Sequence, residues 1–162
     1  HETPPMTWRG VRASMEASSR AGFRFLMRQP EPGEVEAIQT YLRSLTPLPG
    51  PLQTAEGGLT KAAARGKTLF ESEETKCAHC HQAPLYTDLK THDVGTRGPL
   101  DQAGGFDTPS LVEIYRTAPY LHDGSAPSLE DVVGRNAEDE HGRSSHLTKG
   151  EKDDLVAYLL SL

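Results

Sequence analysis

The feature that most constrains this chain is the segment Cys77-Ala78-His79-Cys80-His81. Two cysteines separated by two residues and followed directly by histidine form the attachment motif of haem c. Both thiols add to the vinyl groups of the haem, and the adjacent imidazole reaches the iron from one face. The motif predicts one covalent haem per chain, held by Cys77 and Cys80, with His81 as the proximal iron ligand.

Two other uses of the cysteine pair fit less well. A structural zinc site takes four ligands, and only Cys77, Cys80 and His81 are local here. A redox dithiol of the thioredoxin type is expected near a βαβ pattern, which the sequence lacks. The chain has only these two cysteines, so it has no disulfide framework.

Composition narrows the class of protein further. Hydrophobic residues make up 35% of the 162 residues and aromatic residues 6%, a lean core that a large apolar cofactor would fill. The net charge of -6 gives no global basic footprint for nucleic acid. No stretch approaches the roughly 18–20 apolar residues that span a bilayer, so no membrane span is expected. The first residue is His1 and no signal peptide is present, which suggests a processed, trimmed or partial chain.

The pattern of the chain predicts an all-α, cytochrome c-like fold. Helical spacing follows Thr60 as far as Phe70, and the capping box Thr148-x-x-Glu151 opens a terminal helix over 151–162. Residues 82–109 are expected to form an extended loop, followed by a short apolar helix over 111–115. No segment shows the alternation expected of a strand.

The sequence also repeats itself, which predicts a second, partial domain. Residues 3–16 align without a gap to residues 117–130, and residues 34–45 align to 151–162 after a shift of three. Residues 1–46 are therefore predicted to be the back half of a first cytochrome c-like domain that lacks its haem motif. A linker rich in proline and glycine follows over 47–59, and the haem domain itself covers 60–162. The matched pairs of the first block are Thr3 with Thr117, Pro5 with Pro119, Gly10 with Gly124, Ser14 with Ser128 and Glu16 with Glu130.

Three segments together resemble one family. Residues 77–81, Phe106–Leu111 and Thr117–Gly124 are similar to the C-terminal domain of bacterial di-haem cytochrome c peroxidases and their MauG-like relatives. The resemblance covers about residues 58–162. It implies a haem that receives single electrons from a small redox protein and passes them on, in a periplasmic or extracellular protein. It also implies a missing haem-bearing half-domain, supplied by the same protein or by a second chain.

The resemblance carries expectations for further residues. Trp8, in a segment similar to the family's Trp-Asp-Gly, would lie between two haems; without the resemblance, a core anchor would be the favoured interpretation. Main-chain oxygens of Thr117 and Pro119 would hold a calcium ion. The family's distal methionine falls on Asn136, which is a poor iron ligand. The three methionines, Met6, Met15 and Met27, all precede the haem motif.

Neutral imidazole is the strongest ligand left after Asn136. We therefore predict His141 as the distal ligand, with His146 as the alternative and an open or water-bound iron as the main rival. Other cofactor contacts are predicted from Arg97 and Arg116, which could bind haem propionates, and from His122 at the haem edge. His92 is interpreted as a loop histidine.

Two functions follow from the choice of distal ligand. A six-coordinate iron favours a c-type haem domain for electron transfer, within a cytochrome c peroxidase-like oxidoreductase. An open iron favours direct catalysis by a haem peroxidase or a MauG-like oxidase. A haem sensor is a third interpretation, for which the sequence offers no switch element.

Overall fold

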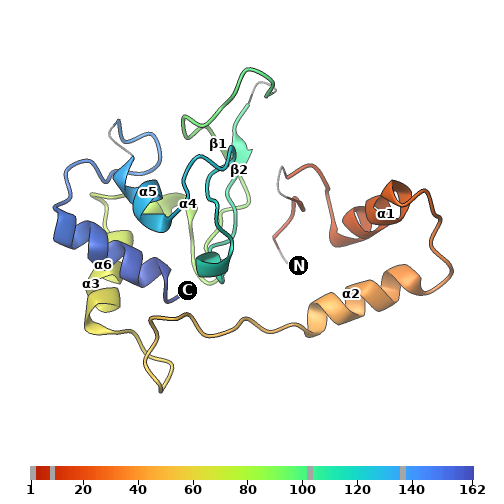
Figure 1. Cartoon of the computed structure of the whole chain (residues 1–162), viewed down its shortest axis with the longest axis horizontal. Coiled ribbons are helices and arrows are strands. Elements are labelled where there is room, and N and C mark those ends of the chain that lie inside the picture. The colour runs from red at the N-terminus through yellow and green to blue at the C-terminus, as the bar shows by residue number, and fades with distance from the viewer. Residues whose placement is uncertain (1–2, 8–9, 102–103, 136–137) are drawn as a thin grey trace. The chain divides into compact units, whose positions relative to one another are not determined.

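The computed structural model describes residues 3–7, 10–101, 104–135 and 138–162 (Figure 1). The chain divides into two compact units, His1–Pro47 and Leu48–Leu162. Most of the regular structure is helical, in keeping with the predicted all-α class, and one sheet of two short strands accompanies it.

The segment predicted as a linker lies almost entirely inside the second unit. Gln53 Nε2 donates a hydrogen bond to the Ser161 carbonyl over 2.7 Å. Gly50 allows a close approach, because a Cβ there would lie 2.6 Å from the carbonyl oxygen of Leu160. These contacts attach the segment to the end of the last helix, which proline and glycine content alone does not predict.

Two helices of the second unit begin at N-terminal caps that can be recognised in the sequence. Helix α3, Lys61–Phe70, begins at Thr60, whose side chain accepts a hydrogen bond from Ala63 N. Helix α6, Lys149–Leu159, begins at the predicted capping box, in which the Thr148 and Glu151 side chains each accept a backbone hydrogen bond. Both predicted helix starts are confirmed.

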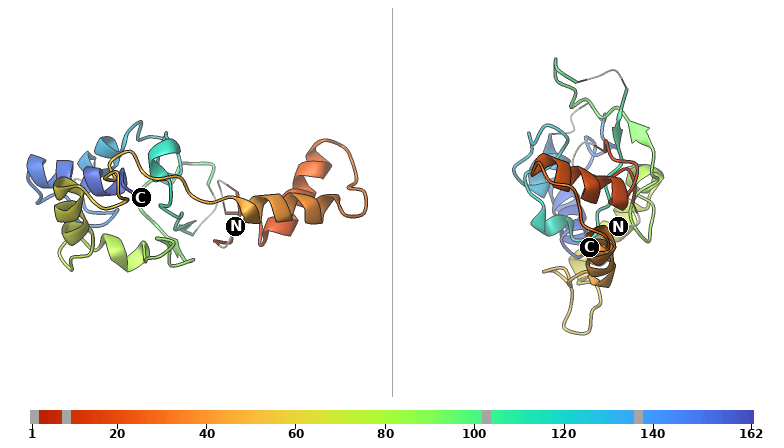
Figure 2. Two further views of the ribbon diagram at one scale, coloured as in Figure 1. Left: turned by 90° about the horizontal axis from the view of Figure 1, so that it is seen from below. Right: turned by 90° about the vertical axis from the view of Figure 1, so that its right-hand side faces the viewer.

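Helices α3 and α6 pack closely against each other (Figures 1 and 2). Gly66 permits this approach, since a Cβ at that position would lie 1.9 Å from the Asp154 carbonyl oxygen. An ion pair between Arg65 of α3 and Asp154 of α6 (2.6 Å) also joins the two helices. The core around the two helices consists of Phe70, Leu111, Tyr120, Ala126, Leu129, Val133, Leu147, Leu155, Val156, Tyr158 and Leu159.

Short elements connect these two helices. They are α4 (Cys77–Cys80), β1 (Thr91–His92), β2 (Phe106–Asp107), the 3-10 helix η1 (Ile114–Arg116) and α5 (Leu129–Gly134). Strands β1 and β2 pair antiparallel within the predicted loop. Two residues are too few to show alternation, which explains why no strand is predicted there. The helix expected over 111–115 is reduced to the single turn of η1.

The first unit contains helices α1 (Met15–Phe25) and α2 (Glu34–Ser44). Its first segment has the same local structure as its counterpart in the sequence repeat. Met6 bridges Arg12 as Tyr120 bridges Ala126. Gly10 and Gly124, at matching positions, both have positive φ angles.

The helices that follow continue the parallel. Ser14 caps α1 as Ser128 caps α5, each side chain accepting a hydrogen bond from the third residue along. In each unit a second helix then packs on the first, α2 on α1 and α6 on α5. The assignment of residues 1–46 to half of a cytochrome c-like domain remains a prediction, and this correspondence agrees with it.

Candidate haem site

The cysteine pair lies on one turn of helix. Lys76, in the left-handed region at φ 57°, precedes α4, which presents the Cys77 and Cys80 thiols from the same turn. Both cysteines are free and partly buried. Burial is the main cause of the raised pKa of each thiol, so both are protonated before any attachment chemistry.

His81 is oriented by a backbone contact. Its Nδ1 lies 2.9 Å from the carbonyl oxygen of Tyr86, so Nδ1 carries the proton and Nε2 remains as the metal-binding nitrogen. Burial lowers the pKa of His81, against the opposing effect of this hydrogen bond. The imidazole is therefore neutral, as a metal ligand must be.

His141 faces His81. The two ring centroids are 6.1 Å apart, with an interplanar angle of 67°. Burial, and then repulsion from His81, lowers the pKa of His141 to about 4. A metal–imidazole bond is about 2.0–2.1 Å long, as measured for zinc, so two imidazoles on opposite sides of one metal ion have centroids about 6 Å apart. The spacing and the neutral state of both rings fit a haem iron.

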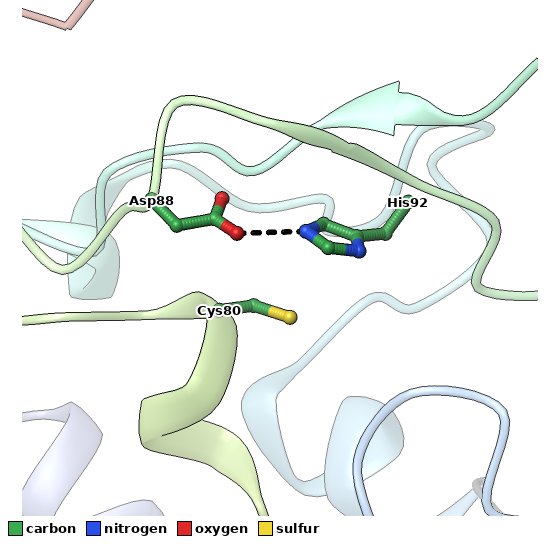
Figure 3. Close-up of side chains that lie close together, drawn as sticks. All are labelled: Cys80, Asp88 and His92. Atoms are coloured by element: carbon green, nitrogen blue, oxygen red, sulfur yellow. Dashed lines mark hydrogen bonds and ion pairs between the residues drawn. The ribbon is translucent and has the colours of Figure 1, made fainter.

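The Asp88 and His92 side chains lie on one side of the Cys80 sulfur (Figure 3). Ligand atoms of Cys80, Asp88 and His92 all lie within 4.8 Å of one another. Asp88 Oδ2 accepts a hydrogen bond from His92 Nε2 (2.8 Å), and the Asp88 side chain is only 5% exposed. Haem attachment would convert the Cys80 sulfur to a thioether, which leaves two donors, fewer than a structural zinc site needs. The Asp88–His92 pair therefore lies beside a predicted haem attachment point and is not interpreted as a zinc site.

His122 is placed in a polar and aromatic setting. Its Nε2 lies 3.0 Å from Asp101 Oδ2, and its ring stacks on Phe106 with centroids 3.5 Å apart. The side chain is 11% exposed. The predicted contact of His122 with the haem edge stays a prediction.

The other predicted residues lie nearer the surface. Arg97 pairs with Asp93 (2.9 Å) and Arg116 with Glu113 (3.0 Å), so each guanidinium has a carboxylate partner already. Their roles as propionate ligands stay predictions. His146, Thr117 and Pro119 are exposed. Trp8 and Asn136 lie outside the described residues.

Comparisons with known proteins identify the family. Residues 105–138 match the RoxA-like, cytochrome c-like domains. The chain is 34% identical to hydrazine synthase subunit gamma of Kuenenia stuttgartiensis, over 87% of this chain and 52% of that protein. It is 30% identical to the methylamine utilization protein MauG of Methylorubrum extorquens, over 78% of this chain and 42% of MauG. A solved structure of Kuenenia stuttgartiensis hydrazine synthase matches with a TM-score of 0.82 and 30% identity, over 99% of this chain and 68% of that one. The chain belongs to the di-haem cytochrome c peroxidase and MauG-like family.

Membership of the di-haem peroxidase and MauG-like family implies a cytochrome c-like domain and covalent haem c. The chain spans about half the length, or less, of the curated relatives it matches. Among the helices that the structure describes, none is long and apolar enough to cross a membrane.

Three residues near the site were not predicted from the sequence. Tyr86 contacts His81 through its backbone carbonyl, which no side-chain motif reveals. Asp88 and Asp139 accept hydrogen bonds from loop residues close to the predicted site. An aspartate in a glycine-rich loop carries only a weak signal, because most such residues are solvated.

Proposed function

We propose that this chain is the electron-transfer haem domain of a di-haem cytochrome c peroxidase-like protein. One haem c would be attached through Cys77 and Cys80 and ligated by His81 and His141. The observation that supports this most directly is the 6.1 Å separation of the two imidazole rings. An iron held by two imidazoles has no open position for peroxide, so the pair favours electron transfer over catalysis at this site.

Bound haem c would supply a one-electron couple, with a lower potential than the same group would have under a methionine and histidine pair. His81 and His141 are the residues of the chain that would hold the iron. Burial keeps His81 and His141 neutral at physiological pH, since it lowers the pKa of each ring. The Tyr86 carbonyl holds His81 in the tautomer that leaves Nε2 to bind iron.

A haem-bearing half-domain, from the same protein or a second chain, is the partner proposed for the first unit. In the repeat, Tyr41 corresponds to Tyr158 and Ile38 to Leu155. Tyr158 is 2% exposed, whereas Tyr41 is 64% exposed. Ile38 is likewise more exposed than the buried Leu155. Exposed apolar faces of this kind mark interaction sites, and the repeat indicates what type of structure would cover this one.

The location, the redox partner and the calcium site are proposed by analogy with the family. The protein would work in the periplasm or outside the cell and exchange electrons with a small redox protein. Its net charge of -6 favours docking to a basic partner. A calcium ion would bind through main-chain oxygens of Thr117 and Pro119.

The experiment is an optical and EPR comparison of the wild-type holo-protein with a His141→Ala variant. We expect a low-spin ferric wild type and a high-spin variant that binds cyanide. His146→Ala is the matched control, because this exposed histidine is the nearest alternative ligand in the sequence. A His141→Ala spectrum that stays low-spin and unchanged would exclude His141 as the ligand.

The same experiment tests direct catalysis, the second candidate function. A wild type that is already high-spin would remove the support for electron transfer and favour a peroxidase or MauG-like oxidase with an open iron. A pyridine haemochrome assay, together with the mass of the denatured chain, gives the number of covalent haems.

A further inference from the structure

The loop that carries His141 is closed by one carboxylate. Asp139 lies two residues before His141, in the left-handed region at φ 55°. Its Oδ1 accepts hydrogen bonds from the backbone nitrogens of Ser144 and Ser145, both over 2.9 Å. Its Oδ2 accepts a third bond from the Ser145 hydroxyl over 2.7 Å. The three bonds join the two ends of the loop, with His141 between them.

The closed loop is also attached to the segment that precedes the cysteine pair. The backbone nitrogen of Arg143 donates to the Thr75 carbonyl over 2.7 Å. Gly142, at φ 73°, lies so close that a Cβ there would be 3.1 Å from the same oxygen and 3.7 Å from the Cys77 sulfur. The position of His141 relative to the haem motif therefore depends on the shape of this loop.

A third attachment fixes the far side of the loop to α5. The buried hydroxyl of Ser144 donates to the carbonyl oxygen of Val133 over 2.9 Å. The loop is thus held by Thr75, by Val133 and by its own carboxylate. Thr75 and Val133 accept through backbone carbonyls, whereas Asp139 accepts through its side chain. Substitution can therefore remove the Asp139 acceptor without altering the backbone.

We propose that Asp139 is a positioning residue for the distal ligand, which closes the loop so that His141 stays at its observed distance from His81. The inference rests on the proposed function, in which His141 binds the iron. Without the carboxylate, the backbone nitrogens of Ser144 and Ser145 lose their acceptor and donate hydrogen bonds to water instead. The loop then opens, and His141 exchanges with external ligands.

The test is the rate of cyanide binding to the ferric holo-protein, together with its high-spin fraction. We expect Asp139→Ala to bind cyanide about tenfold faster than wild type or more, since it removes three hydrogen bonds to a charged group. Asp139→Asn keeps an acceptor oxygen for both backbone nitrogens and should stay close to wild type. Asp153→Ala removes an exposed carboxylate of the same unit, paired only with Lys149 in the described contacts, and is the charge control.

Two outcomes separate this inference from the proposed function. If Asp139→Ala binds cyanide at the wild-type rate while His141→Ala binds it much faster, Asp139 does not position the ligand. If His141→Ala also leaves the rate unchanged, the distal assignment itself is wrong. If Asp139→Ala fails to fold or to attach haem, the Ser145→Ala variant tests the inference in its place. It removes only the 2.7 Å bond from the Ser145 hydroxyl, so the rate of cyanide binding should increase by an intermediate amount. A wild-type rate for Ser145→Ala would then count against the inference.

Discussion

Replacing Gly66 by alanine should destabilise the second unit, although alanine is the better helix former. Gly66 lies inside α3, where it meets α6. A Cβ there would be 1.9 Å from the carbonyl oxygen of Asp154 and 2.5 Å from its carbonyl carbon. Ordinary contacts between heavy atoms are about 3.5–4.0 Å, so the two helices would have to separate by more than about 1 Å. The obstructing atoms belong to the backbone and cannot rotate away.

The net effect follows from two opposing contributions. Alanine in place of glycine inside a helix stabilises it by about 0.8–1.0 kcal/mol. Overpacking a well-packed core costs about 1–3 kcal/mol, and more where the backbone itself must move. Because the obstruction at Gly66 is backbone, the cost should lie at the upper end, about 3 kcal/mol, which leaves a net loss of about 2 kcal/mol. For a unit of this size, that corresponds to a fall of roughly 8 °C in the melting temperature.

The measurement is thermal unfolding of the holo-protein, followed by far-UV circular dichroism and by the Soret band. Gly150→Ala is the matched control, because Gly150 lies in α6 of the same unit and a Cβ added there would meet no atom within 4 Å. That variant should be as stable as wild type or slightly more stable. Equal melting temperatures for the two variants would refute the argument that Gly66 sets the approach of α3 to α6.

Three further predictions follow from contacts of the site. Burial opposes ionisation of Asp88, but the hydrogen bond from His92 and others bring its pKa to about 2. Asp88→Asn should therefore cost roughly 2 kcal/mol at neutral pH, and denaturant titrations should show this difference shrinking as the pH falls from about 4 to about 2. A difference that is constant with pH would contradict the assignment. The hydroxyl groups of Tyr86 and Tyr158 are 3.1 Å apart, so each Tyr→Phe change should cost about 1 kcal/mol and the double variant less than the sum; strict additivity would argue against this bond. Gly142→Ala, at φ 73°, should cost about 1–2 kcal/mol in chemical denaturation and raise the high-spin fraction; an unchanged spectrum would show that the loop tolerates a side chain there.

The sequence predicts those features whose signals are local. The starts of α3 and α6 follow from Thr60 and the Thr148–Glu151 capping box, because a cap needs only three or four neighbouring residues. The haem motif is likewise recognisable because it occupies only five consecutive residues, Cys77 to His81. The choice of His141 follows from the absence of methionine after the motif. The structure brings its ring to 6.1 Å from that of His81, and its role as a ligand stays a prediction.

Features that depend on distant segments could not be predicted in this way. The strands β1 and β2 are too short to alternate, and they pair only because the chain between them turns back. Residues 48–59 resemble a free linker until their contacts with the last helix are seen. The partners of Asp88 and Asp139 lie within six residues of each carboxylate, but the bonds depend on how each loop turns, and no residue pattern in these loops predicts that turn.

The pairing of α3 with α6 also bears on how the protein is made. α3 and the cysteine pair leave the ribosome well before α6, so the surface of α3 around Gly66 has no partner while residues 77–81 are being synthesised. Contacts between segments far apart in sequence form slowly, since a long loop must close first. The thiols of Cys77 and Cys80 are therefore expected to stay accessible for a time after synthesis. In the folded unit, with α6 in place, both cysteines are partly buried.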